Sequence, residues 1–221
     1  MNLPEPAAVL LDLDGTLVDT VATRIEAWLR VFAEFGIPAQ REAVTGLIGS
    51  DGKHLAREVS HLAERQIDDD LAERIDKRSG EIYSQLNTDP RMLPGVAEFL
   101  DAVEARGIPW AIATSSRREQ TGPSISALAR ANEPRMVDGS SVERAKPEPD
   151  LLLAAARELA VPATACWCVG DSTWDMRAAV AAGMTPVAVL AGSAATPQEL
   201  RAAGATVCVA RIDELVPALT A

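Results

Sequence analysis

The chain has 221 residues, and 48% of them are apolar, which is enough to bury the core of one large domain or of a core domain with a smaller one. Asp and Glu number 32 against 21 Lys and Arg, and the resulting formal charge of −11 argues against a nucleic-acid backbone or an anionic membrane as the main partner. A small anionic substrate stays open, because a local site can be positive inside a negative protein.

The cysteines and the N-terminus indicate the compartment. Cys166, Cys168 and Cys208 are too few and odd in number for a disulfide framework, and with only two histidines they do not suggest a zinc site. We expect buried thiols in a reducing cytoplasm. The N-terminal MNLPEP lacks the basic segment of a signal peptide, and no stretch has the length of a membrane span.

The first predicted element is a strand at Ala7–Leu13 (AAVLLDL). Its residues before Asp12 are apolar on both faces, as in a parallel sheet that helices cover. Polar residues then follow abruptly at Asp14, Gly15 and Thr16.

The next part of the chain, about residues 18 to 89, has a helical pattern. Apolar residues recur at helical spacing from Val21 to Phe32, and Gly36 ends that helix. Two further amphipathic stretches lie at 55–62 and 71–86, without a convincing strand between them. We therefore expect a core of residues 1–17 and 90–221 with a small helical domain, residues 18–89, inserted after the first strand.

From residue 90 onward, strands and helices alternate. The predicted strands lie at 110–114, 135–137, 165–169, 186–190 and 205–209, and the helices at 94–107, 117–130, 147–160, 172–182 and 197–203, with a last helix from Asp213. This alternation predicts an α/β fold with a parallel, doubly wound sheet. Such sheets bind ligands at the carboxyl ends of their strands.

Two carboxylates, Asp12 and Asp14, follow the first strand. Alternation along a strand places them on one side, where they repel each other unless a cation or a shared proton lies between them. Most Asp-x-Asp sequences are solvated turns. Here the apolar strand before the pair and Gly-Thr after it favour a functional site.

Two more polar clusters suit a phosphate. Thr114-Ser115-Ser116 offers hydroxyls and backbone N–H groups before a helix, although taken alone it favours an ordinary N-cap. Lys146 is expected just before a helix that begins at Pro147, where it opposes the helix dipole. A bound anion would resolve that conflict; an exposed surface lysine is the alternative.

The fourth cluster contains Asp171 and Asp175, which share one face at the start of a helix. Helix capping is the alternative explanation for both. If they face Asp12 and Asp14, the four carboxylates make a hard-oxygen site of the kind that holds Mg²⁺ and takes a phosphate oxygen.

The ordered set of motifs resembles the haloacid dehalogenase-like superfamily, in its branch of phosphatases and phosphomutases with a helical cap. The four motifs read DLDGTLVDT, ATSS, AKPEPD and GDSTWD, and each follows its own predicted strand. The resemblance covers nearly the whole chain. It implies a Rossmann-like core and places residues 18–89 at the position of the cap.

The resemblance also implies roles for individual residues. Asp12 corresponds to the nucleophile that forms an aspartyl-phosphate, and Asp14 to the general acid and base. The implied phosphate binders are Thr114, Ser115 and Lys146, with Thr114 and Lys146 also stabilising charge during transfer. The implied Mg²⁺ ligands are Asp12, the backbone carbonyl of Asp14 and Asp171, with Asp175 supporting from behind.

Asp14 and Arg24 separate the branches of that superfamily. The dehalogenase and phosphonate-cleaving branches lack a carboxylate at the position of Asp14. The β-phosphoglucomutase branch carries a histidine ten residues after its general acid, where this chain has Arg24. Water is therefore the expected acceptor, and a phosphomutase is the alternative. A signalling phospho-acceptor is shorter and lacks the insertion, and a non-catalytic binding protein would have a broken motif.

The expected function is a Mg²⁺-dependent phosphatase of small phosphorylated metabolites. Phosphoglycolate, sugar phosphates and nucleotide monophosphates all stay open as substrates. Discrimination is expected from the insertion, whose least regular stretch is Gly46–His54. There Ser50, Lys53 and His54 are expected to contact the leaving group; a flexible surface turn is the alternative.

Overall fold

The computed structural model describes residues 3–219, which contain one parallel sheet of six strands. The strands are β1 (Ala8–Leu11), β2 (Trp110–Ala113), β3 (Met136–Val137), β4 (Cys166–Gly170), β5 (Thr185–Val189) and β6 (Val207–Val209). Their order is β3-β2-β1-β4-β5-β6, and every neighbouring pair is parallel. The predicted α/β fold is confirmed.

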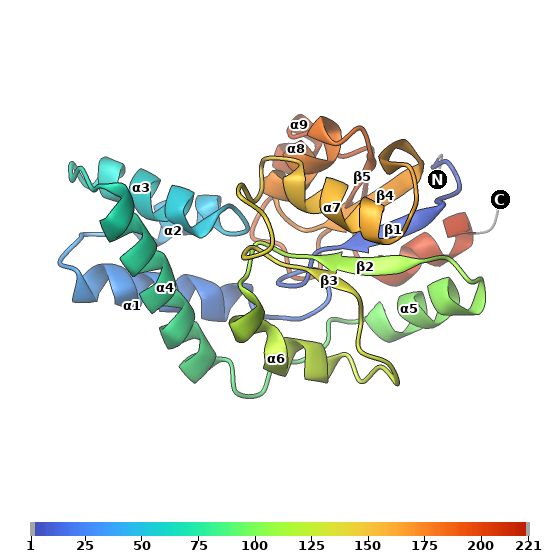
Figure 1. Ribbon diagram of the computed structural model, residues 1–221, viewed down its shortest axis with the longest axis horizontal. Helices are drawn as coiled ribbons and strands as arrows, with labels where there is room; N and C mark the ends of the chain where they lie inside the picture. Colours follow the sequence, from blue (N-terminus) through green and yellow to red (C-terminus); the bar gives the residue numbers. More distant parts are fainter. Residues whose placement is uncertain (1–2, 220–221) are drawn as a thin grey trace.

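Helices cover both faces of this sheet (Figure 1). One face carries α5 (Val96–Ala105), α6 (Arg118–Ala127) and the C-terminal 3₁₀ segment η2 (Ile212–Leu219). The other carries α7 (Asp150–Glu158), α8 (Thr173–Ala181) and α9 (Pro197–Ala202), and a short 3₁₀ turn, η1 (Ala163–Ala165), precedes β4.

Strand β1 shows why its sequence is apolar on both faces. Val9 and Leu11 pack into the core that includes α5, whereas Ala8 and Leu10 pack into the core that includes α7. All four side chains are fully buried. Because burying a leucine-sized side chain contributes about 1.5–3 kcal/mol, both layers hold β1 firmly at the centre of the sheet.

The helical insertion predicted after the first strand is confirmed. It consists of α1 (Val21–Glu34), α2 (Arg41–Leu47), α3 (Gly52–Leu62) and α4 (Asp69–Leu86), which lie together beside the sheet in Figure 1. These helices, here called the four-helix insertion, bury a cluster of their own around Phe32, Leu55 and Tyr83. The domain limits at residues 17/18 and 89/90 stay a prediction.

Two helices differ from the prediction. Helix α2 was not expected, because it is short and Val44 is its buried residue. Helix α7 begins at Asp150 and not at Pro147, since Pro149 disfavours a helical backbone at Glu148. Lys146 therefore lies in a turn ahead of the helix, and the prediction that the dipole of α7 opposes it is wrong.

The strand order determines where the polar motifs meet. Strand β1 lies between β2 and β4, and in the register Leu11 pairs with both Ile112 and Val169. Asp12, Thr114 and Asp171 therefore follow three adjacent strands at one edge of the sheet. The strand order reverses between β1 and β4, the position at which open α/β sheets bind ligands.

The buried thiols and the membrane prediction can be compared with the structure as well. Cys166 and Cys168 are buried in β4, and all three cysteines are free. No helix within residues 3–219 is long and apolar enough to cross a bilayer.

Candidate active site

Lys146 lies between two carboxylates at the edge of the sheet. Its Nζ is 2.5 Å from Oδ1 of Asp12 and 2.6 Å from Oδ1 of Asp175, and its side chain is 1% exposed. Burial disfavours the ammonium, but the charges of Asp12 and Asp175 outweigh burial and raise the pKa of Lys146. Lys146 is thus a buried, permanently charged group beside Asp12, and not a surface lysine.

The start of α8 positions Asp175. The Oγ of Ser172 accepts from the N–H of Asp175 at 3.2 Å, and Oδ2 of Asp175 accepts from the N–H of Ser172 at 3.0 Å. This reciprocal capping fixes the Asp175 side chain at the first turn. Beside it, the Thr16 hydroxyl donates to Oδ1 of Asp171 at 3.1 Å. The bonds that cap α8 therefore also hold the Asp175 carboxylate toward Lys146.

Asp12, Asp171 and Asp175 form a buried acidic triad. Each offers a carboxylate oxygen within 4.8 Å of the others. Burial raises the pKa of Asp12 to about 7 against the opposing charge of Lys146, and burial together with the charges of Asp175 and Asp12 raises the pKa of Asp171. These shifts mean that the triad carries more negative charge than its surroundings compensate.

A divalent cation fits this triad. Lys146 supplies one positive charge for three carboxylates, and its ammonium contacts two of them, Asp12 and Asp175. Three carboxylate oxygens are hard donors of the type that Mg²⁺ prefers. The donor set and the excess negative charge both agree with such an ion.

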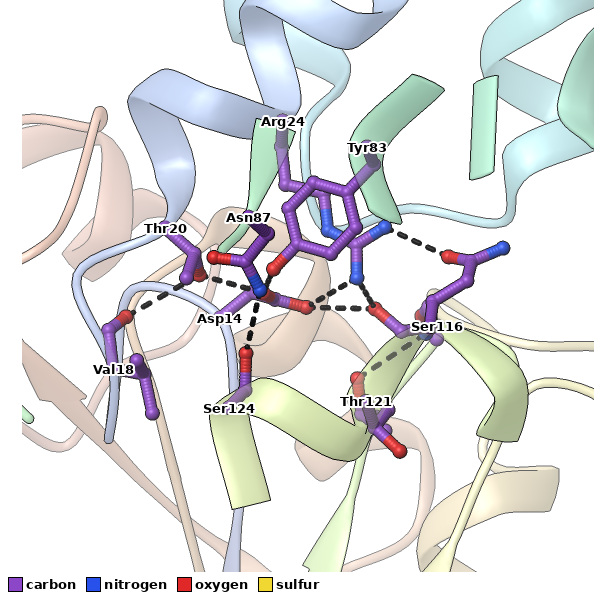
Figure 2. A network of polar contacts seen from close by, with 12 residues as sticks. Asp14, Val18, Thr20, Arg24, Tyr83, Asn87, Ser116, Thr121 and Ser124 are labelled. Atoms are coloured by element: carbon purple, nitrogen blue, oxygen red, sulfur yellow. Dashed lines mark hydrogen bonds and ion pairs between the residues drawn. The ribbon is translucent and has the colours of Figure 1, made fainter. Parts of the chain in front are cut away.

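Asp14 is held by a separate network (Figure 2). Its Oδ1 accepts from the hydroxyls of Thr20 at 2.6 Å and Tyr83 at 2.9 Å, and its Oδ2 accepts from Ser116 Oγ at 2.7 Å and Arg24 Nη2 at 3.0 Å. Burial alone raises the pKa of Asp14, but the charge of Arg24 and the bonds from Thr20 and Ser116 outweigh burial and lower it. Asp12 and Asp14 therefore have different partners and different proton affinities.

Arg24 connects the insertion to this network. Its guanidinium lies against the Tyr83 ring (Figure 2), 3.3 Å from the ring centroid. It donates to Oε1 of Gln120 at 2.8 Å and to Ser116 Oγ at 2.6 Å. Nothing in the sequence singles out Tyr83 or Gln120, since they belong to no motif, and Thr20 ends the first motif without an assigned role. The one signal was Arg24 at the position of the mutase histidine.

The three hydroxyl residues after β2 do not cap α6. Helix α6 has Arg117 at its N-cap, without a side-chain capping bond. Thr114 is buried, and its Oγ1 accepts from the N–H of Ser116 at 3.2 Å, whereas Ser115 donates to the carbonyl of Gly49 at 3.1 Å. The N-cap alternative is therefore set aside, and the hydroxyl protons of Ser115 and Ser116 are donated to Gly49 and Asp14.

A cavity of about 70 Å³ separates the insertion from the sheet edge. Core residues on its wall include Asp12, Asp14, Thr114 and Ser115, and insertion residues include Arg24 and Ser50. Both proposed reacting carboxylates and a guanidinium thus face one small space.

Ser50, Lys53 and His54 occupy different places. Ser50 is on the cavity wall, and neither Lys53 nor His54 is among the described residues that line it. Nζ of Lys53 lies 3.7 Å from Oε2 of Glu73, and the His54 ring packs edge-on against Trp174 at 5.5 Å between centroids. A role for these residues in recognition stays a prediction.

The insertion is joined to the core around the cavity. Nη2 of Arg117 lies 2.6 Å from Oδ2 of Asp76 and 2.7 Å from Oε1 of Glu73, both on α4. The N–H of Asp51 donates to the carbonyl of Lys146 at 2.9 Å. These bonds hold the insertion over the cavity.

Comparisons with known proteins agree with this arrangement. The sequence profile of the haloacid dehalogenase-like hydrolases matches residues 9–189. A plasmid-encoded phosphoglycolate phosphatase of Cupriavidus necator is 34% identical over 219 residues, which cover 96% of this chain and 93% of that protein.

Solved structures share the fold as well. The crystal structure of a hydrolase from Pseudomonas syringae superposes with a TM-score of 0.90 at 31% identity, over 96% of this chain and 97% of that one. A putative β-phosphoglucomutase from Bacteroides vulgatus gives a TM-score of 0.82 at 22% identity, over 96% of this chain and 87% of that one.

Proposed function

The chain belongs to the haloacid dehalogenase-like hydrolases and is a phosphatase of phosphoric monoesters, and we propose that it works by Mg²⁺-dependent phosphoryl transfer to Asp12. The observation that carries this proposal is the environment of the Asp12 carboxylate. It is desolvated, ion-paired with Lys146 and on the wall of a cavity that also exposes Asp14. A nucleophile and a separate proton carrier thus share one enclosed space.

In the proposed reaction, an oxygen of Asp12 attacks the phosphorus while the bond from phosphorus to the leaving oxygen breaks. Asp14, whose pKa is lowered in the unliganded site, must first take up a proton, and it gives this proton to the leaving oxygen. In the second half, water attacks the aspartyl-phosphate, Asp14 takes a proton from the water, and inorganic phosphate leaves with Asp12 restored. Lys146 and the hydroxyls of Thr114 and Ser115 are the proposed donors to the phosphoryl oxygens.

The proposed Mg²⁺ ligands are Asp12, the backbone carbonyl of Asp14 and Asp171. Asp175 supports them from behind through Lys146 and Ser172. When bound, the ion neutralises the charge of the carboxylates and of the phosphoryl oxygens, which lowers the cost of bringing two anions together.

We propose that the substrates are small phosphorylated metabolites met in the cytoplasm. The relative from Cupriavidus necator is named a phosphoglycolate phosphatase, so 2-phosphoglycolate is the first substrate to test. The cavity lies between the insertion and the sheet edge, so we propose that the insertion contacts the leaving group of the substrate.

The test is phosphate release from 2-phosphoglycolate, glucose 6-phosphate and a nucleoside monophosphate, with Mg²⁺ and with EDTA. We expect stoichiometric inorganic phosphate with Mg²⁺ and none with EDTA. An isomerised sugar phosphate without free phosphate would favour a phosphomutase. A phosphorylated protein that never releases phosphate would favour a signalling phospho-acceptor.

A further inference from the structure

Arg24 is a cation on the cavity wall with more hydrogen-bond donors than acceptors. Its guanidinium has five N–H donors. Within residues 3–219 it donates to Gln120, Asp14 and Ser116, and its Nε is buried without an acceptor. A buried donor without a partner is unusual in a folded protein and indicates a missing acceptor.

The other two cations near the cavity are already matched by carboxylates. Lys146 pairs with Asp12 and Asp175, and Arg117 pairs with Asp76 and Glu73. Arg24, in contrast, has one carboxylate, Asp14, and otherwise neutral partners. It is therefore the cation in this group with the greatest capacity for another anion.

The position of Arg24 determines which part of a substrate it can reach. Its Nη2 lies 3.0 Å from Oδ2 of Asp14, the residue that is proposed to protonate the leaving oxygen. Substituents close to the leaving oxygen therefore come within reach of the guanidinium, whereas the phosphoryl group lies at Asp12. Nη1 has one N–H beyond its bond to Gln120, and this N–H can donate a charge-assisted hydrogen bond to a carboxylate, which is a stronger bond than one to a hydroxyl.

The surroundings hold this guanidinium in place. Tyr83 covers one face at 3.3 Å, and Gln120 binds Nη1 at 2.8 Å. The Arg24 side chain is 12% exposed, so its orientation is set before a ligand arrives. A preorganised donor of this kind loses little entropy on binding, and it rejects a ligand that lacks the matching acceptor.

We propose that Arg24 is a specificity-determining residue that binds a carboxylate on the leaving group. The enzyme then prefers short phosphate esters of hydroxy acids over neutral esters of the same length. This inference rests on the proposed function, because it takes Asp14 as the group that faces the leaving oxygen.

The test compares Arg24→Met with the unaltered enzyme on two substrates, 2-phosphoglycolate and 2-hydroxyethyl phosphate. The second replaces the carboxylate by a hydroxymethyl group and keeps the chain length. We expect the ratio of the two kcat/KM values to fall by roughly 10- to 100-fold in Arg24→Met, the range of a charged hydrogen bond. Because both rates come from one preparation, a partly folded variant does not change their ratio.

Two further variants separate recognition from positioning. Tyr83→Phe removes a hydrogen bond to Asp14 but keeps the ring over Arg24, so it is expected to slow both substrates alike. Arg24→Lys keeps the charge without the planar fork and is expected to give an intermediate ratio.

Three outcomes decide the matter. An unchanged ratio in Arg24→Met, with both substrates slowed, would make Arg24 a positioning residue for Asp14 and overturn the inference. An unaltered enzyme that does not prefer 2-phosphoglycolate would overturn it too. Absence of phosphate release from every ester would instead contradict the proposed function, and the inference with it.

Discussion

Nζ of Lys146 lies 2.5 Å from Oδ1 of Asp12, although 134 positions separate the two residues in the chain. Both side chains are almost fully buried, and the Lys146 ammonium also serves Asp175. One cation thus stands against three clustered carboxylates. This imbalance of charge affects the stability of the folded protein, which can be measured without catalysis.

In EDTA, the pH dependence of the free energy of unfolding should show the titration of Asp12. Its pKa is about 7 in the folded protein, above the ordinary value of 3.8, mainly because burial disfavours its charge. The folded state therefore keeps a proton that the unfolded chain releases. The resulting stabilisation of the folded state is complete below pH 3.8 and is lost as the pH rises through about 7.

Urea unfolding between about pH 4 and pH 8 measures this effect. The difference between the unaltered protein and Asp12→Asn isolates Asp12 from other groups, and we expect a slope of up to about 1.4 kcal/mol per pH unit to disappear in the variant. Mg²⁺ should stabilise the unaltered protein more at pH 8 than at pH 5. Parallel curves for the two proteins would contradict the assigned burial of Asp12.

Asp14→Asn should separate the two halves of the reaction. The variant keeps Asp12 and Lys146, so it should still take a phosphoryl group from p-nitrophenyl phosphate, whose leaving group needs no proton. Hydrolysis should then slow by about 10²–10⁴-fold, because the water lacks its base. A rapid-quench experiment is expected to show a burst of p-nitrophenol and slow turnover. Turnover at the unaltered rate would remove Asp14 from the mechanism.

Gly15→Ala should weaken metal binding. Gly15 has φ +84°, and an added Cβ would collide with Oδ2 of Asp171. Gly107, at φ +67°, has nothing within 4 Å of the corresponding position, so Gly107→Ala carries the backbone strain alone. We expect Gly107→Ala to lose about 1–2 kcal/mol of stability, and Gly15→Ala to lose more, because its Cβ would also collide with Val21, and to need far more Mg²⁺ for half-maximal activity. Equal Mg²⁺ requirements would argue against Asp171 as a ligand.

Lys53→Ala tests the loop that the sequence assigns to specificity. Lys53 approaches Glu73, which also binds Arg117 beside the cavity. We expect kcat/KM to fall more for 2-phosphoglycolate than for p-nitrophenyl phosphate, since the second offers the insertion little to hold. Lys77→Ala, on an exposed face of α4, is the matched control. Equal losses on both substrates, or none, would rule this loop out.

The motifs were predictable because of the sheet. Asp12, Asp171 and Asp175 each follow a strand that is apolar on both faces, and parallel strands bring their carboxyl ends to one edge. Lys146 was singled out from its expected place directly before a helix, but Pro149 delays the start of α7, and its role in the site stays a prediction. The position of its ammonium is explained instead by the carboxylates of Asp12 and Asp175, which it contacts.

The partners of Asp14 could not be predicted in the same way. Arg24 and Tyr83 lie on α1 and α4, and Gln120 lies on α6, so their meeting depends on how the insertion docks on the core. No local sequence pattern predicts how the insertion docks on the core. The register of the sheet follows from periodicity, whereas a contact between two folded units depends on tertiary packing alone.

The central claim is that Asp12 carries the phosphoryl group, and peptide mapping tests it most directly. Asp14→Asn is incubated with p-nitrophenyl phosphate and Mg²⁺, quenched in acid and digested, and the phosphorylated residue is located by mass spectrometry. We expect the phosphoryl group on Asp12, and neither this adduct nor phosphate release in a folded Asp12→Asn protein. A phosphoryl group on another residue, or unaltered phosphate release by Asp12→Asn, would contradict the account.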